Sequence, residues 1–329
     1  MIRTCNTSMR LRPPVVLVCV SFWLGAVWAA APGEPLEPQV NLFVIGDLGF
    51  SPPENRTPDQ EKTARAMAAY AAKSLIAFDA TLICGDNFKV KLTGPDDPQF
   101  RQAFEEMYDA QALKMPFFAV LGNHDCESKS AAAQLDYAAK HPESRWKMPG
   151  RWYRLDLPAA QPLVTILMLD SNRDVIGKEQ WQAQLRWLDE ELCKPRKSAW
   201  TIWLTHYPLF SDGQHGDNGA LKKAWGPLLT KHKVDFYLSG HDHILQHLQL
   251  PDWQTTFIIS GGGGENTKRP VSRSRGPFMR AVHGFAVVQF SARSAKVSLV
   301  DDTGMLLHVF ERDRSGEIGI LSTTPSDKP

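Results

Sequence analysis

Two histidines one residue apart, His241 and His243, follow a run that is typical of a buried strand, Asp235–Ser239. On a regular strand their side chains would point to opposite faces. At the end of a strand, a small rotation of the backbone lets both imidazoles reach two neighbouring points, which is what a pair of metal ions requires. The alternative interpretation is a polar loop with two solvated histidines. The decision depends on how the other predicted strands end.

Four other apolar runs end in the same manner. Each lacks the clean alternation of a half-exposed strand, which favours strands that are buried on both faces of a parallel sheet. Because ligands of open α/β sheets gather outside the carboxyl ends of strands, we expect the polar residues at these ends to converge on one crevice. These residues are Asp47, Asp86, Asn123 with His124, and His206.

Carboxylate, amide and imidazole groups are ligands of hard and borderline metal ions, and the motifs offer no thiolate. Two metal ions about 3.5–4 Å apart, with one carboxylate between them, form a clamp for in-line displacement at phosphorus. Such a clamp polarises the phosphoryl oxygens and lowers the pKa of a bridging water. Histidines beside the metal ligands would protonate the leaving alkoxide. The strand ends therefore predict a phosphoryl-transfer site with two metals.

The composition is that of an ordinary globular protein. The chain has 329 residues, a formal net charge of +1 and 43% hydrophobic residues, which is enough to bury a sizeable core. A nucleic-acid-binding protein usually carries a basic face, and the balanced charge argues against that function. We predict one catalytic domain over residues 32–312 and a disordered tail over residues 313–329.

The first 31 residues are predicted to be a signal peptide. Arg3, Arg10 and Arg12 precede an apolar run from Val15 to Ala31 that ends in small residues. The run is short for a membrane span. We therefore expect a secreted or periplasmic protein, and the alternative is a leader that stays attached as an N-terminal anchor.

After cleavage of the leader, three cysteines remain: Cys84, Cys126 and Cys193. An odd number leaves at least one free thiol in an oxidising compartment. Whether Cys84 and Cys126 approach closely enough for a disulfide is left open by the sequence. Buried, reduced thiols are the default expectation.

Helical and strand patterns succeed one another along the chain, which indicates an α/β protein with mixed strands and outer helices. Residues 146–152 are expected to be a loop, and Gly261–Gly264 a flexible turn. The predicted helices cover residues 57–78, 99–110, 128–140, 179–193 and 220–232. The predicted strands cover residues 40–45, 81–84, 115–121, 153–157, 164–169, 200–205, 235–239, 254–259, 284–290, 295–300 and 305–310.

In its strand-end motifs the chain resembles the calcineurin-like metallophosphoesterases. The residues around them, with Gly284-Phe285-Ala286 further on, are most similar to the small, mammalian-type purple (tartrate-resistant) acid phosphatases. The resemblance extends over residues 40–310. The five motifs are Gly46-Asp47-x-Gly49, Gly85-Asp86-Asn87-Phe88, Gly122-Asn123-His124-Asp125, Thr205-His206-Tyr207-Pro208 and Gly240-His241-Asp242-His243.

The resemblance implies a four-layer αββα sandwich, in which two mixed sheets pack together and helices lie outside. It implies that Asp86 bridges two metal ions and that Asp47 and His243 complete one of the two sites. The ligands implied for the other site are Asn123, His206 and His241.

The resemblance also assigns residues to the substrate side. His124 and His215 match family positions that contact the substrate phosphate and assist protonation of the leaving group. Taken alone, His215 would be a loop histidine beside Gly216. Asp125 and Asp242 are expected to orient neighbouring histidines.

One position departs from the family pattern. Purple acid phosphatases carry a tyrosine three residues after the bridging aspartate, and its phenolate binds Fe(III) and gives the colour, whereas this chain has Lys89. A protonated ammonium has no lone pair, and two cations repel it, so Lys89 is not expected to be a ligand. We expect Lys89 to turn away or to contact the substrate phosphate. The implied centre is not purple and holds iron with iron, zinc or manganese.

The predicted function is hydrolysis of phosphate monoesters by a metal-activated hydroxide, as in an acid phosphatase. The expected partners are small phosphorylated substrates, with phosphoproteins and nucleotides as further candidates, and the chain is expected to be a monomer. One alternative is a phosphodiesterase or nucleotidase of the same fold. The other is a metal-poor pseudoenzyme that binds a phosphorylated ligand without turnover.

Overall fold

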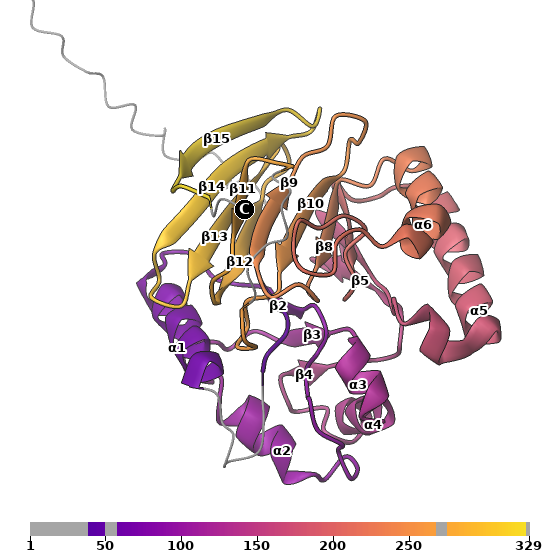
Figure 1. Cartoon of the computed structure of the whole chain (residues 1–329), viewed down its shortest axis with the longest axis vertical. Coiled ribbons are helices and arrows are strands. Elements are labelled where there is room, and N and C mark those ends of the chain that lie inside the picture. Colours follow the sequence, from indigo (N-terminus) through magenta and orange to yellow (C-terminus); the bar gives the residue numbers. More distant parts are fainter. Residues whose placement is uncertain (1–38, 50–57, 268–274, 327–329) are drawn as a thin grey trace, which may run out of the picture. The chain divides into compact units, whose positions relative to one another are not determined.

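The computed structural model describes residues 39–49, 58–267 and 275–326. The predicted signal peptide, residues 1–31, lies outside the described residues. The described strands form two mixed β-sheets that share one apolar core, and helices cover the outer face of each sheet (Figure 1). This arrangement confirms the predicted αββα sandwich.

The first sheet combines a parallel part with an antiparallel part. β1 to β4 run parallel to one another, and β12 continues the sheet antiparallel to β1. In the part of the chain that the structure describes, its order is β15 (Ile318–Thr323), β14 (Leu306–Asp313), β13 (Ser294–Asp301), β12 (Gly284–Phe290), β1 (Val40–Ile45), β2 (Ala80–Ile83), β3 (Phe117–Ala119) and β4 (Trp146–Lys147).

The second sheet has a parallel centre. β6, β7, β8 and β10 are parallel, while β5, β9 and β11 join at the two sides as antiparallel strands. Among the described residues the order is β11 (Phe278–Arg280), β9 (Leu245–Leu248), β10 (Thr256–Ser260), β8 (Phe236–Ser239), β7 (Trp200–Leu204), β6 (Val164–Met168) and β5 (Tyr153–Leu157).

Helices flank both sheets. Figure 1 shows α1 beside the first sheet and α5 and α6 beside the second. None of the described helices combines the length and the apolar character needed to cross a bilayer. The helices are α1 (Pro58–Lys73), α2 (Pro98–Phe100), the π-helical turn η2 (Arg101–Glu105), α3 (Asn123–Glu127), α4 (Ala131–Lys140), α5 (Arg173–Cys193) and α6 (Gly219–Lys231).

The unbroken apolar runs of the sequence follow from burial on both faces of each sheet. In β1, Leu42 and Val44 point into the core between the sheets, whereas Phe43 and Ile45 point toward the helices. Successive side chains of a strand alternate in this way, so a strand that is covered on both sides has no polar face. All six residues of β1 are buried.

The fold brings the ends of the motif strands together. β1, β2 and β3 are neighbours in the first sheet, and β7 and β8 are neighbours in the second. The two sheets share a core, which includes Leu82 of β2 and Leu238 of β8. The loops after five strands therefore meet at one edge of the sandwich.

Several local predictions are wrong. Within the predicted disordered tail, residues 318–323 are a strand, β15, which pairs along β14 with Phe310 opposite Ile320. The tail contains glycine and serine residues and Ile320 is exposed, so its sequence pattern does not indicate a strand. Backbone hydrogen bonds to β14 support this strand. The predicted loop 146–152 begins with β4, and β9, β11 and α3 were not predicted.

The predicted helix over residues 99–110 is a short helix followed by a π-helical turn. The Asp97 side chain accepts a hydrogen bond from Gln99 N and caps α2. The wider turn that follows lets the ring of Phe100 stack on that of Tyr137, with 3.9 Å between the ring centroids. The ring of Phe104 packs against Trp146, with 5.1 Å between the ring centroids. Tertiary packing thus overrides the simple helical pattern.

The three cysteines that follow the predicted leader are free thiols. Cys84 and Cys126 are buried, as expected, but Cys193 is exposed at the end of α5.

Candidate metal centre

Three of the motif residues adopt left-handed backbone conformations at the ends of their strands. Their φ angles are 58° for Asp47, 52° for Asp86 and 71° for His241. A non-glycine residue pays about 1–3 kcal/mol for such a conformation and keeps it only where the surroundings enforce it. Each of the three turns sharply out of its strand, so its side chain points into the shared crevice. Backbone strain of this kind concentrates at functional sites.

The glycines of the motifs allow loops to approach the two carboxylates. A Cβ atom on Gly240 would overlap Asp47 Oδ2, and one on Gly122 would overlap Asp86 Oδ1. The close approach permits two hydrogen bonds, from His241 N to Asp47 Oδ2 and from His124 N to Asp86 Oδ1, each 2.9 Å long. The sequence pattern of a glycine before each polar residue therefore has a steric cause.

One group of ligand atoms surrounds His206. Its Nδ1 lies 2.9 Å from the carbonyl oxygen of Cys84 and donates to it, so the neutral ring presents a lone pair at Nε2. That lone pair faces Asn123 Oδ1 at 2.9 Å, and Asp86 Oδ1 lies 3.4 Å away. His241 Nδ1 is 3.2 Å from the same nitrogen.

The contact between His206 and Asn123, with the amide oxygen facing the ring, suits a shared cation. Burial lowers the pKa of His206 to about 3 and that of His241 to about 2, so neither ring carries an extra proton at neutral pH. His206 Nε2 and Asn123 Oδ1 are then two lone-pair atoms at hydrogen-bond distance without a proton between them. Such a pair is repulsive unless a cation sits at the same place, and this donor set suits Fe²⁺, Zn²⁺ or Mn²⁺.

A second group of ligand atoms surrounds Asp47 and His243. Asp47 Oδ1 is buried and has no hydrogen-bond partner among the described residues. His243 Nδ1 lies 2.8 Å from the carbonyl oxygen of Asn266 and donates to it, which turns Nε2 toward Asp47 Oδ1 at 3.7 Å. Ligand atoms of Asp47, Asp86 and His206 lie within 4.8 Å of one another, so Asp86 borders both groups.

The carboxylates of the centre are buried close together. Burial raises the pKa of Asp86 to about 6, and burial together with the charge of Asp86 raises the pKa of Asp47 well above its usual value. Two buried carboxylates cannot both ionise cheaply unless a positive charge compensates them. These residues fit a pair of metal ions.

The affinity for metal is expected to fall as the pH is lowered through 6. Only ionised Asp86 binds a cation, and at pH 5 about nine-tenths of it is protonated. Because the pKa of Asp47 is raised as well, the apparent affinity for Zn²⁺ should be at least about tenfold weaker than at pH 7. His206 and His241 titrate too low to compete in this range. Calorimetric titration at both pH values measures the change, and equal affinities would contradict this assignment.

Two histidines line the open side of the crevice. The side chain of His124 is 39% exposed, and its Nε2 lies 3.9 Å from Asp86 Oδ2. His215 is 41% exposed, and its Nδ1 lies 2.8 Å from Asp242 Oδ1. The ring centroids of His215 and His241 are 4.1 Å apart. A hollow of about 300 Å³ lies beside these two rings and has space for a small ligand.

The two aspartates beside the ligand residues have different partners. Asp242 orients His215 and also accepts a hydrogen bond from Ser211. Burial would raise the pKa of Asp242, but the hydrogen bonds from His215 and Ser211 outweigh this effect and lower it.

Asp125 has a structural role among the described residues. It accepts hydrogen bonds from the backbone N–H groups of Asn87, Phe88 and Gly122, and from the side chain of Gln134. A fully buried carboxylate needs such donors. Asp125 thereby ties the loop of Asp86 to the loop of Asn123.

Lys89 forms an ion pair with Glu265. It therefore turns toward a buried carboxylate at the centre rather than away from it. Glu265 also lies 3.1 Å from His243 Nε2, and it is a residue that the sequence motifs missed.

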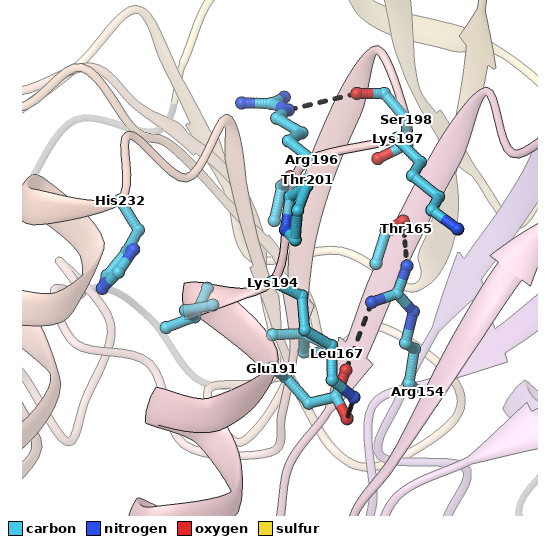
Figure 2. A pocket seen from close by; sticks show the side chains of 12 residues that line it. Arg154, Thr165, Leu167, Glu191, Lys194, Arg196, Lys197, Ser198, Thr201 and His232 are labelled. Atoms are coloured by element: carbon cyan, nitrogen blue, oxygen red, sulfur yellow. Dashed lines mark hydrogen bonds and ion pairs between the residues drawn. The ribbon is translucent and has the colours of Figure 1, made fainter.

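Another hollow, lined by Arg154, Arg196 and Lys197 among others, lies between the end of α5 and the strands β5 to β7 (Figure 2). Its volume of about 70 Å³ is well below the roughly 300 Å³ at which small-molecule pockets begin. Arg154 is paired with Asp156 and Glu191, and Arg196 with Asp235. Size and charge thus disfavour this hollow as a substrate site.

Comparison with known proteins places these observations in a family. Residues 40–245 match the family model described as calcineurin-like phosphoesterase. Tartrate-resistant acid phosphatase type 5 of Sus scrofa is 30% identical over 299 residues, which cover 82% of this chain and 86% of the pig protein. Purple acid phosphatase 17 of Arabidopsis thaliana is 30% identical over 289 residues, which cover 82% of this chain and 83% of the plant protein.

A solved structure has a similar fold. GAP50, described as the anchor in the inner membrane complex of Plasmodium, superposes with a TM-score of 0.68. The match covers 88% of this chain and 91% of that one, at 22% identity. At this level of identity the likeness shows the fold alone.

Proposed function

The chain belongs to the calcineurin-like phosphoesterase family, and from that premise we propose that it hydrolyses phosphate monoesters at a binuclear metal centre. The observation that carries the proposal is the 2.9 Å contact between His206 Nε2 and Asn123 Oδ1, a pair of atoms that suits a shared cation. The proposed substrates are small phosphorylated molecules, and the proposed form is an exported monomer.

The residues at the two groups of ligand atoms would hold one metal ion each. Asn123, His206 and His241 belong to the first group, Asp47 and His243 belong to the second, and Asp86 borders both. Two bound metal ions would supply activation of water and neutralisation of the charge on the phosphoryl oxygens. Burial keeps the histidine ligands neutral, as the low pKa values of His206 and His241 indicate. Each carboxylate ligand carries at most a single negative charge.

The chain's own contribution to bond cleavage would come from the open side of the crevice. His215 donates a hydrogen bond from Nδ1 to Asp242 Oδ1, and the doubly protonated ring would then offer Nε2–H to a ligand in the adjoining hollow. His124 lies beside Asp86 and is exposed enough to contact a phosphate. One of these two histidines would donate the single proton that the departing alkoxide takes up to leave as an alcohol.

A reconstitution experiment tests the proposal. Metal-free protein supplied with Fe²⁺, Zn²⁺ or Mn²⁺ is expected to hydrolyse p-nitrophenyl phosphate, with bis(p-nitrophenyl) phosphate and nucleotides as comparison substrates. Preference for the monoester supports a phosphatase, while preference for the diester or for nucleotides would replace it with a phosphodiesterase or nucleotidase. Binding of phosphate without turnover of any substrate would instead identify a pseudoenzyme.

Replacing His215 with asparagine should affect poor leaving groups most. An alkyl phosphate such as β-glycerophosphate needs protonation of its leaving oxygen, so its turnover should fall about 100-fold. p-Nitrophenolate departs without protonation, so turnover of its ester should fall less than about tenfold. Equal losses on both substrates, at unchanged metal content, would contradict the role of His215.

The protein loaded with iron is expected to lack the visible band of an iron–tyrosinate centre. Lys89 occupies the position at which the family resemblance places the tyrosine. Tyr207 borders the crevice and packs on the ring of His241 at 4.4 Å, but burial raises its pKa to about 12 and keeps it protonated. A visible absorption spectrum checks this, and a violet protein would show that a phenolate has become a ligand.

A further inference from the structure

The loop after β10 brings a carboxylate outside the five motifs to the metal centre. β10 runs parallel to β8 and beside it, so both strands end at the same edge of the sheet. The backbone N–H of Glu265 donates to the carbonyl oxygen of Asp47 at 3.1 Å, and the carbonyl oxygen of Glu265 accepts from His283 Nε2 at 2.9 Å. These bonds fix Glu265 against the backbone of a residue of the centre.

The side chain of Glu265 is fully buried and points at the ligand atoms. Its Oε2 lies 3.1 Å from His243 Nε2, and one of its oxygens lies within 4.8 Å of ligand atoms on Asp86 and His124. Its Oε1 accepts no hydrogen bond from the residues that the structure describes. A buried carboxylate oxygen without a donor is costly, and a metal ion at this place would give it a partner in addition to the ion pair with Lys89.

The distances agree with a shared metal ion. Two neighbouring ligand atoms that each lie about 2.1 Å from one ion in octahedral geometry are about 3 Å apart. The separation of Glu265 Oε2 from His243 Nε2 is 3.1 Å. We infer that Glu265 is a ligand of the metal ion held by Asp47 and His243, and that Lys89 adapts this site to a divalent ion. The inference rests on the proposed binuclear centre.

Lys89 changes the charge that the centre presents to a metal. The carboxylates of Asp47, Asp86 and Glu265 together carry a charge of −3, and the ammonium of Lys89 brings the net charge to −2. Because Coulomb attraction scales with the product of the charges, this reduction costs a trivalent ion more than a divalent one. The carboxylate of Glu265 and the ammonium of Lys89 together therefore take the place of the single anionic tyrosinate that the family resemblance implies.

Titration of the metal-free full chain with Zn²⁺, followed by calorimetry and elemental analysis, tests the role of Glu265. The wild type is expected to bind about two ions. Glu265→Gln should keep one tight ion and bind the other at least about 100-fold more weakly, since even residues behind the ligands change metal affinity by about 10–100-fold. Glu143→Gln, which neutralises a 74% exposed carboxylate beside His141, is the matched control and should bind both ions normally.

The outcomes separate the inference from the proposed function. Two ions bound with equal affinity by wild type and Glu265→Gln would overturn the inference and leave the proposed function standing. Fewer than one ion on the wild type would overturn both. Thermal melts keep a folding defect apart from the loss of a ligand: Glu265→Gln should melt near the wild type without metal and gain less stability when Zn²⁺ is added.

The charge of Lys89 is tested by a ratio of affinities. Lys89→Met should raise the affinity for Ga³⁺, a trivalent ion without redox chemistry, relative to the affinity for Zn²⁺ by at least about tenfold. If Lys89→Met also disorders the Glu265 side chain, the affinities for Ga³⁺ and Zn²⁺ both fall, so this effect cancels in the ratio of the two affinities. An unchanged ratio would overturn the adaptation to divalent ions.

Discussion

Replacing Asp86 with asparagine is expected to reduce turnover of p-nitrophenyl phosphate at least about 1000-fold, which corresponds to about 4 kcal/mol of transition-state stabilisation. Asp86 borders both groups of ligand atoms, with Oδ1 3.4 Å from His206 Nε2 and Oδ2 3.9 Å from His124 Nε2. Asparagine can still accept the hydrogen bond from His124 N, so the loop should keep its place. The metal content should fall below one ion per chain, measured by elemental analysis.

The control for this variant is Asp136→Asn. Asp136 is exposed on α4, so the same chemical change there should leave turnover and metal content unaltered. If Asp86→Asn retained wild-type turnover, a metal centre at this crevice would be ruled out as the source of the activity.

Replacing His241 with alanine should remove one metal ion and lower turnover about 100-fold, a smaller loss than that of Asp86→Asn. His241 Nδ1 lies 3.2 Å from His206 Nε2, whereas His243 belongs to the other group of ligand atoms. Losing one ligand should therefore weaken one ion and spare the other. Elemental analysis and steady-state kinetics measure the two effects.

His141→Ala provides the comparison for His241→Ala. His141 ends α4 and contacts Asp96 and Glu143 at the surface, so its removal should change neither the metal content nor the turnover. Loss of both ions from His241→Ala would contradict the division of the ligands into two groups.

The apolar runs predicted the convergence of the motifs because the parallel strands are buried on both faces, whereas the four-layer sandwich was implied by the family resemblance. β1 is an example. Its four successive apolar residues point alternately into the core between the sheets and into the core beneath the helices, so the run has no polar positions. Elements that depend on tertiary contacts escaped prediction. The tail strand β15 has a weak pattern of its own and forms against β14, and the turn after Phe100 widens to fit aromatic neighbours.

Within the site, the sequence indicated residues that directly follow strands, and it missed Glu265. Four glycines separate Glu265 from the end of β10, and no motif includes it. Two signals were nevertheless available. β10 is a further apolar run of the same character, and a lysine in place of an anionic ligand calls for a carboxylate partner nearby.

Asp242 was expected to orient a neighbouring histidine, and it contacts His215, a partner that the sequence did not indicate. Asp242 is adjacent in sequence to His241 and His243, and it reaches the loop of His215 across the crevice. Asp125 points instead at three backbone N–H groups. A sequence places a carboxylate near a loop, but it does not indicate which donors that loop will turn inward.

The most direct test of the metal centre is anomalous diffraction from crystals of the zinc-loaded protein. Two anomalous peaks about 3.5–4 Å apart are expected, with Asp86 between them. One peak should lie at Asn123, His206 and His241, and the other at Asp47 and His243. Absence of both peaks from this crevice, at saturating Zn²⁺, would contradict the proposed function.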